Sequence, residues 1–174
     1  MYRKMERYKV NFKDIVVIIM ITLAVTFVIK QFYMISTVDG YSMESTLYDK
    51  EMLILDVNAY DKEKPKYKDI IVFERRDLIQ RYFIKRVIAT EGDTLKIENN
   101  KLFINNELID EYYIKEEMIT EDLEVKIPKG KVFAMGDNRN NSMDSRSYII
   151  GLVDVKQEII GKAIFSLTEL KKIE

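Results

Sequence analysis

The sequence of 174 residues contains no cysteine and no histidine. Without cysteine, the chain has no disulfide, no zinc–thiolate site and no thiol nucleophile. Without histidine, it cannot build a Ser-His-Asp triad or an imidazole metal site. Oxygen ligands can still bind Ca²⁺ or Mg²⁺, but the sequence has no Asp-x-Asp-x-Asp-Gly loop. We therefore expect no metal and no cofactor.

An excess of either charge is also missing. The formal net charge is −1, so nothing draws the chain as a whole toward nucleic acid, and we expect no nucleic-acid partner. No repeat and no low-complexity stretch is visible. The length suits one membrane anchor followed by one domain of about 140 residues.

One long apolar run, Ile15–Ile29, stands near the N-terminus. Lys30 interrupts it, and apolar and aromatic residues continue to Ile35, so that the stretch reaches the roughly 20 residues that a membrane span needs. A long lysine stem can carry its charge to the headgroups. No Ala-x-Ala-like site follows, which argues against a cleaved secretory signal, and no polar face marks a soluble core helix. The sequence predicts a transmembrane anchor over residues 14–35.

The residues before this anchor are basic. Residues 1–13 contain one acid, Glu6, against five basic side chains: Arg3, Lys4, Arg7, Lys9 and Lys13. Basic residues collect on the cytoplasmic side of membrane proteins. We therefore expect a cytoplasmic tail over residues 1–13, a single pass through the cell membrane, and an extracytoplasmic remainder.

The rest of the chain has short apolar runs separated by turn residues, which is typical of antiparallel sheets. Strands are predicted at residues 52–55, 70–73, 82–88, 94–97, 101–104, 107–109, 125–127, 132–134 and 159–165. Asn99-Asn100 and Asn105-Asn106 predict hairpin turns. Residues 111–124 fit a loop or a short helix. The predicted fold class is mostly β: a transmembrane helix, then an antiparallel β domain over residues 36–174, with residues 91–128 as a small inserted β subdomain.

Ser42 lies shortly after the apolar run, in Gly40-Tyr41-Ser42-Met43. The ordinary interpretation is a turn serine, but Gly40 also permits a close backbone approach, and neighbouring N–H groups can then face an oxyanion. A serine nucleophile needs a base, and without histidine a neutral lysine is the strongest one available. Burial can lower a lysine pKa by up to roughly 3–5 units. The lysine should therefore lie within an apolar strand.

Lys85 meets this requirement. Strand alternation places Phe83, Lys85 and Val87 on one face of the predicted strand 82–88. The alternative is an edge-strand lysine that points into solvent and discourages aggregation.

A third element, Gly136–Arg146, holds eleven mostly polar residues. Asp137, Arg139, Asp144 and Arg146 can interlock as ion pairs that fix the shape of this segment. Its Ser142 can hydrogen-bond a nearby amine.

With these three elements in order, the chain resembles the bacterial type I signal peptidases, which are Ser-Lys serine proteases, and in particular their smaller, single-anchor, Gram-positive-like form. Four blocks carry the resemblance, which spans residues 15–165: Gly40–Thr46, Lys68–Phe73, Tyr82–Asp93 and Gly136–Arg146. The last block is the most specific and the serine block alone the least.

The resemblance implies a role for each matched position. Ser42 corresponds to the nucleophile, Lys85 to the general base, and Ser142 to the serine that orients the lysine amine. Gly40 falls at a position that assists the Ser42 backbone N–H in binding the oxyanion, although glycine offers no hydroxyl. Asp144 and Arg146 match a salt-bridged pair that shapes the site. Pocket residues for small side chains at positions −1 and −3 correspond to Val38, Met43, Leu47, Phe83 and Ile84.

Four positions depart from the family pattern. Ser45 stands where proline is usual and Lys68 where glycine is usual, and Ala89 and Glu91 replace common glycine and proline. None of these changes removes a group that does chemistry. They affect loop geometry and substrate preference, and we still expect an active enzyme.

The implied function is removal of N-terminal signal peptides from secreted preproteins. The implied partners are preprotein signal peptides, the lipid bilayer and protein translocation machinery nearby. A specialised Ser-Lys peptidase for pilin or conjugation substrates is an alternative. The anchor and the missing DNA-binding segment argue against a self-cleaving repressor, and the joint presence of Ser42, Lys85 and Ser142 argues against a non-catalytic peptide-binding domain.

Overall fold

The computed structural model describes residues 11–79 and 82–173. The chain divides into two compact units, one ending at Phe32 and one beginning at Tyr33. Each unit is built around a different kind of secondary structure, so they are described in turn.

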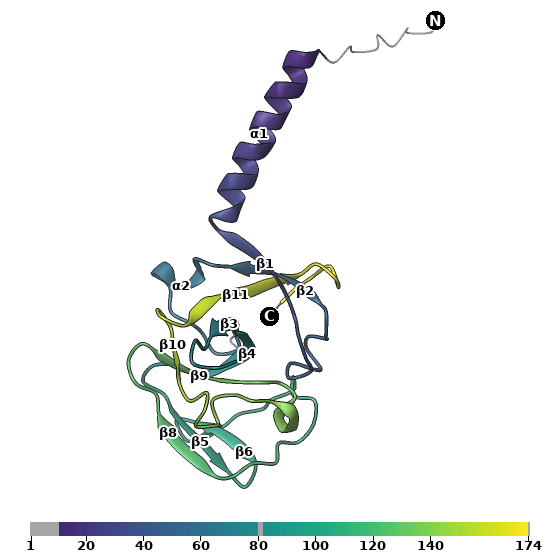
Figure 1. Cartoon of the computed structure of the whole chain (residues 1–174). Helices are drawn as coiled ribbons and strands as arrows, with labels where there is room; N and C mark the ends of the chain where they lie inside the picture. The colour runs from purple at the N-terminus through teal and green to yellow at the C-terminus, as the bar shows by residue number, and fades with distance from the viewer. Residues whose placement is uncertain (1–10, 80–81, 174) are drawn as a thin grey trace, which may run out of the picture. The chain divides into compact units, whose positions relative to one another are not determined.

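The first unit contains one helix, α1 (Phe12–Lys30), drawn as a single continuous coil in Figure 1. Its N-cap is Asn11, whose backbone N–H donates to the Asp14 carboxylate at 2.9 Å. An acid in the first turn and Lys30 in the last turn both suit the helix dipole. Within the described residues, α1 is the one helix long and apolar enough to cross a membrane, with a mean hydropathy of 2.4.

The helix has different bounds from the predicted anchor of residues 14–35. It ends at Lys30, because Tyr33–Thr37 form strand β1 and pair with strand β2 (Met52–Asp56), Tyr33 opposite Asp56. Apolar residues suit a strand as well as a span, so composition alone extended the prediction too far. The 19 residues of α1 rise about 28 Å, close to the thickness of a bilayer core. Of the predicted basic tail, residues 1–10 lie outside the described residues.

The second unit is mostly β, which confirms the predicted fold class. Its main sheet has eight antiparallel strands in the order β1-β2-β11-β3-β4-β9-β10 (Figure 1), with β12 paired to β11. The strands not yet bounded are β3 (Ile70–Glu74), β4 (Tyr82–Ala89), β9 (Lys131–Met135), β10 (Val153–Asp154), β11 (Ile159–Ser166) and β12 (Lys171–Lys172). Two short helices, α2 (Ala59–Lys62) and η1 (Arg139–Asn141), lie in the connections.

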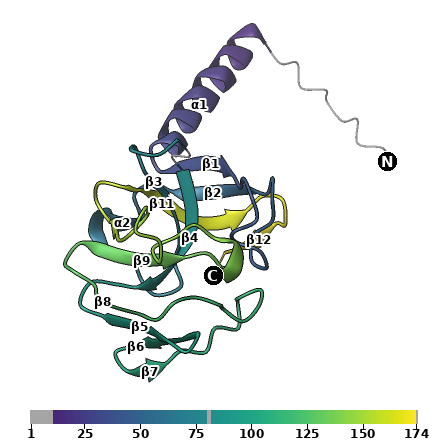
Figure 2. The ribbon, with the colours of Figure 1, turned by 60° about the horizontal axis from the view of Figure 1, so that its bottom comes forward.

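A second sheet has the order β7-β6-β5-β8. Its strands are β5 (Thr94–Glu98), β6 (Lys101–Ile104), β7 (Glu107–Leu108) and β8 (Leu123–Lys126). Figure 2 shows it as a layer beside β9. Both predicted hairpin turns are present, with all four asparagines at positive φ, a conformation that asparagine tolerates better than most residues. All four strands fall within residues 91–128, the predicted insertion.

Three hydrophobic clusters hold the second unit together. One lies between the two sheets and joins Ile88 and Phe133 of the main sheet to Leu95 and Ile97 of the second. Another lies around Phe73, Phe83 and Val87, and the third includes Met43, Leu47 and Leu55. Phe83 and Val87 of the second cluster lie two residues to either side of Lys85, and Met43 of the third follows Ser42, so the clusters fix the backbone from which both side chains project.

Candidate active site

Ser42 lies in a compact turn between β1 and β2. The turn starts at Gly40, whose φ of +99° is in the region that favours glycine and whose N–H donates to Asp49 Oδ1 at 2.9 Å. It closes where the N–H groups of Thr46 and Leu47 donate to the Met43 carbonyl. Met43 and Leu47 are fully buried and anchor the turn in the core. Ser42 is thereby held between two fixed points.

Lys85 points from β4 to this turn. Its Nζ lies 2.7 Å from Ser42 Oγ and 2.9 Å from the Ile84 carbonyl oxygen. Only 3% of the residue is exposed, and its amine lies 5.8 Å from the centre of the Phe83 ring, as strand alternation predicted. A solvent-facing edge lysine is therefore excluded.

Burial lowers the pKa of Lys85 from 10.5 to about 8. The apolar surroundings cannot solvate an ammonium ion, and this effect outweighs the attraction of Asp144 and Asp137 for a protonated amine. Arg146 works in the same direction as burial. At pH 7, about a tenth of the molecules then carry a neutral Lys85 amine, against well under a hundredth for an unperturbed lysine.

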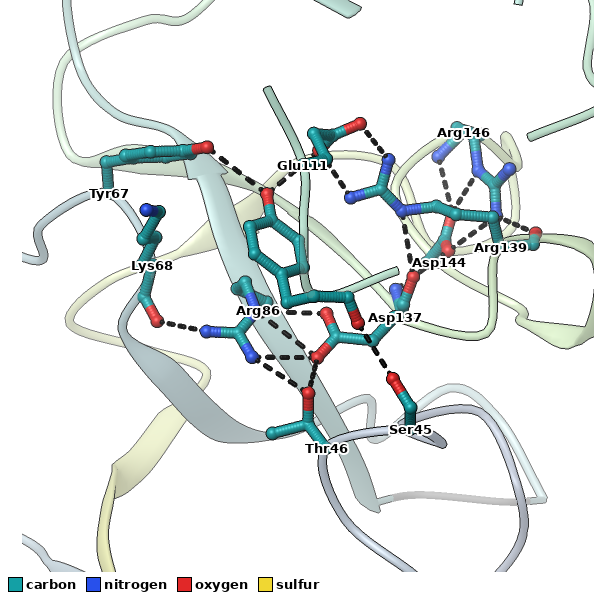
Figure 3. Close-up of polar contacts among 12 residues, drawn as sticks. Ser45, Thr46, Tyr67, Lys68, Arg86, Glu111, Asp137, Arg139, Asp144 and Arg146 are labelled. Atoms are coloured by element: carbon teal, nitrogen blue, oxygen red, sulfur yellow. Dashed lines mark hydrogen bonds and ion pairs between the residues drawn. The ribbon is translucent and has the colours of Figure 1, made fainter. Parts of the chain in front are cut away.

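Both nearby carboxylates are paired with arginines. The Asp137 carboxylate accepts from Arg86 Nη2 at 2.7 Å and Nε at 2.9 Å, with both residues buried. Asp144 accepts from Arg146 Nη2 at 2.8 Å and from the Gly136 N–H at 3.1 Å. Figure 3 shows both pairs. The arginines offset the negative charge that would otherwise keep Lys85 protonated.

The ion pairs differ in part from those expected within Gly136–Arg146. Asp144 and Arg146 do pair. Asp137 instead pairs with Arg86 of β4, and Arg139 is held by Glu111, with Nη1 and Nη2 each 2.6 Å from one of its carboxylate oxygens (Figure 3). The segment is therefore tied to other parts of the domain more than to itself, which its own composition could not reveal.

Ser142 lies beside the nucleophile, but its hydroxyl does not bond Lys85. Its Oγ is buried and has no hydrogen-bond partner among the described residues. A Cβ added to Gly136 would come within 2.3 Å of this oxygen and 2.4 Å of the Ser42 carbonyl oxygen. Gly136 therefore lets Ser142 and Ser42 approach each other. The lysine-orienting role of Ser142 remains a prediction.

Asn138 is a site residue that the sequence reasoning missed. Its backbone N–H donates to the Ser42 carbonyl at 3.0 Å, and its side-chain amide donates to the Tyr41 carbonyl at 3.0 Å. These two bonds fix the serine turn against the Gly136–Arg146 segment. The match of Asn138 to the family block was visible in the sequence, but nothing there indicated its partner.

A groove of about 560 Å³ runs from Ser42 and Lys85 between β1 and β4. Of the predicted pocket residues, Val38, Phe83 and Ile84 line it. Met43 and Leu47 do not, because their side chains are buried in the core beneath the serine turn. The remaining lining residues are Met34, Ile35, Ser36, Thr37, Asp39, Leu53, Val72, Tyr82 and Ile160.

Taken together, a serine hydroxyl beside a buried lysine amine, both lining one groove, fits a hydrolase in which lysine serves the nucleophile in place of histidine. Among residues 11–79 and 82–173, no group of three or more acidic side chains could hold a metal ion.

Comparison with known proteins places this chain in a family. The model of the signal peptidase family, peptidase S26, matches residues 12–168. Signal peptidase I P of Bacillus subtilis subsp. natto is 36% identical over 174 residues, covering 92% of this chain and 91% of that protein. Signal peptidase I of Bacillus amyloliquefaciens is 33% identical, covering 78% and 77%. A crystal structure of a signal peptidase I from Enterococcus faecalis is 28% identical over 57% of this chain and 97% of its own, with a TM-score of 0.49.

The chain belongs to the signal peptidase family, peptidase S26. It is a serine peptidase, and the resemblance inferred from the four sequence blocks is confirmed.

Proposed function

We propose that the protein is a membrane-anchored endopeptidase that removes N-terminal signal peptides from preproteins, with Ser42 as nucleophile and Lys85 as general base. One observation carries the proposal: Nζ of a buried lysine with a lowered pKa lies 2.7 Å from Ser42 Oγ. This distance is short enough for a hydrogen bond through which the proton can pass from the hydroxyl to the amine.

The reaction proceeds in two halves. Neutral Lys85 takes the Ser42 proton as Oγ attacks the carbonyl carbon at the cleavage site, and the Ser42 backbone N–H is the expected oxyanion donor. Gly40 contributes no hydroxyl there. The lysine ammonium then protonates the leaving amine, and the mature protein departs. Lys85 next takes a proton from water, whose oxygen attacks the ester, and returns that proton to Ser42 Oγ as the ester bond breaks and the signal peptide leaves with a free carboxylate.

An extended substrate fits the groove. Strand β4 pairs with β3 from Tyr82 onward but with β9 only from Arg86, so residues 82–85 keep one edge without a strand partner among the described strands. An extended peptide can pair with such an edge. Alternate substrate side chains then point into the groove, where the lining residues Val38 and Phe83 are apolar and almost fully buried and suit small apolar side chains. This supports an Ala-x-Ala-like preference.

The apolar helix α1 supports membrane attachment. With a basic N-terminal tail, the proposed orientation places residues 1–13 in the cytoplasm and the catalytic domain outside. In the proposed function, translocated preproteins reach the enzyme with their signal peptides still in the bilayer, near the translocation machinery.

A cleavage assay tests the proposal. The full chain in detergent, incubated with a labelled preprotein carrying an Ala-x-Ala site, should release the mature protein with its N-terminus directly after the small residue. Ser42→Ala and Lys85→Ala should each reduce the rate by at least about 10³-fold. Matched controls are Ser147→Ala and Lys96→Ala, which alter partly exposed side chains outside the groove. Cleavage by Lys85→Ala at the parental rate would refute the proposed base.

A further inference from the structure

Tyr113 makes contacts with three separate parts of the active site. It lies in the irregular stretch between β7 and β8, and only 6% of it is exposed. Its carbonyl oxygen accepts a hydrogen bond from Ser45 Oγ at 3.1 Å. Its hydroxyl donates to Glu111 Oε1 at 2.8 Å and lies 3.2 Å from the Tyr67 hydroxyl. The hydroxyl, which is the one polar group of this buried side chain, is therefore hydrogen-bonded.

The ring of Tyr113 also faces two buried guanidinium groups. Arg86 Cζ lies 4.3 Å and Arg139 Cζ 5.9 Å from the ring centre. A cation over an aromatic face is held most strongly when both are shielded from water, as here. Each guanidinium is also held by a carboxylate, Asp137 for Arg86 and Glu111 for Arg139 (Figure 3).

Each contact is close in sequence to a group of the proposed site. Ser45 lies three residues after Ser42, Arg86 directly follows Lys85, and Arg139 lies three residues before Ser142. We propose that Tyr113 is a positioning residue that holds the serine turn, the lysine strand and the Gly136–Arg146 segment in register. This inference rests on the proposed Ser42–Lys85 chemistry and extends it to a residue outside the four sequence blocks.

A positioning role predicts a catalytic signature. The charged groups that act on the Lys85 amine are Asp137, Asp144 and Arg146, and Arg86 stands next to it on β4. While the Tyr113 ring covers Arg86, the guanidinium stays out of water and paired with Asp137. Without the ring, water enters, the pair loosens, and Asp137 holds the proton on Lys85 to a higher pH.

Three variants distinguish the effect of losing the Tyr113 ring from the effect of losing its hydroxyl and from the effect of losing a tyrosine ring elsewhere in the same stretch. Tyr113→Leu removes the ring, Tyr113→Phe keeps it, and Tyr112→Leu makes the same change at an adjacent, exposed tyrosine. With the full chain and the labelled preprotein, Tyr113→Leu should lower kcat at least about tenfold with KM within about twofold, and should move the midpoint of the pH profile upward by about half a unit or more. Tyr113→Phe should stay within about threefold of the parent with an unmoved midpoint, and Tyr112→Leu should match the parent.

Two results would overturn the inference: a Tyr113→Leu enzyme with the parental kcat and pH midpoint, or a Tyr113→Phe enzyme impaired as much as Tyr113→Leu. If Tyr113→Leu does not fold, Ser45→Ala replaces it. That change removes one hydrogen bond at an exposed residue and should lower kcat about 3- to 10-fold with an unchanged melting temperature. A parental kcat for Ser45→Ala would then count against the inference.

The same assay keeps the two proposals apart. If Ser42→Ala cleaves the preprotein like the parent, the proposed function fails, whatever Tyr113 does. If Ser42→Ala is inactive while Tyr113→Leu behaves like the parent, the function stands and the positioning role of Tyr113 fails.

Discussion

Replacing Lys85 by methionine should abolish activity and yet stabilise the protein at neutral pH. The amine is buried, and burial holds its folded-state pKa at about 8, against 10.5 without burial. Below pH 8 the fold must therefore keep a poorly solvated ammonium group inside the domain. Methionine has a similar length and carries no charge, so it fills the same space without this cost.

The magnitude follows from the two pKa values. Because the folded-state pKa lies below the unfolded one, the unfolded chain binds more protons, and the destabilisation is complete below about pH 8 and disappears as the pH rises to 10.5. The shift corresponds to about 3 kcal/mol. Losing the contacts with Ser42 Oγ and the Ile84 carbonyl costs about 1 kcal/mol. Lys85→Met should therefore be about 2 kcal/mol more stable than the parent at pH 7 and about 1 kcal/mol less stable at pH 11.

Denaturant unfolding of the full chain in detergent, followed by circular dichroism at both pH values, measures the difference. Lys96→Met is the matched control, since Lys96 is a partly exposed lysine on β5 with a surface partner, Glu98, and should change stability by no more than about 0.5 kcal/mol. A Lys85→Met protein less stable than the parent at pH 7, or an effect that does not change with pH, would refute the buried-amine reasoning.

Three further substitutions test residues that surround the Ser42–Lys85 pair. Ser142→Ala should leave the free energy of unfolding within about 0.5 kcal/mol of the parent value, because no hydrogen bond to a described residue is lost. If Ser142 orients the Lys85 amine, kcat should fall about tenfold. Unfolding and cleavage assays measure the two effects separately. Gly136→Ala should destabilise by about 1–3 kcal/mol and lower activity, since the new methyl would meet the Ser42 carbonyl; a thermal melt at the parental temperature would contradict this. Asp137→Asn should destabilise by about 3–5 kcal/mol by leaving Arg86 buried without its carboxylate, and denaturant unfolding at the parental midpoint would exclude that.

The strands and the direction in which the Lys85 side chain points could be predicted because their patterns are local. Apolar runs flanked by asparagine turns set the hairpins, and alternation alone placed Lys85 on the same face as Phe83. The end of α1 could not be predicted, because Tyr33–Thr37 become a strand only through pairing with β2, which is a contact between distant segments.

The residues that surround and support the site could not be predicted, for the same reason. Glu111 and Tyr113 lie in an acidic stretch with no periodicity, and their importance comes from Arg139 and Arg86, which are distant in sequence. Met43 was expected to line a substrate pocket because it follows Ser42, but the turn directs its side chain into the core. The position of a residue in a motif shows which residue of the family it corresponds to, but it does not reveal where the side chain points.

The pH dependence of kcat/KM for preprotein cleavage tests most directly whether Lys85 acts as a neutral base. This profile reports the free enzyme, so it should rise with pH as Lys85 loses its proton and level off with a midpoint near 8. A profile that is flat through this range, or that keeps rising with a midpoint near 10.5, would contradict the assignment of a buried Lys85 amine as the base for Ser42.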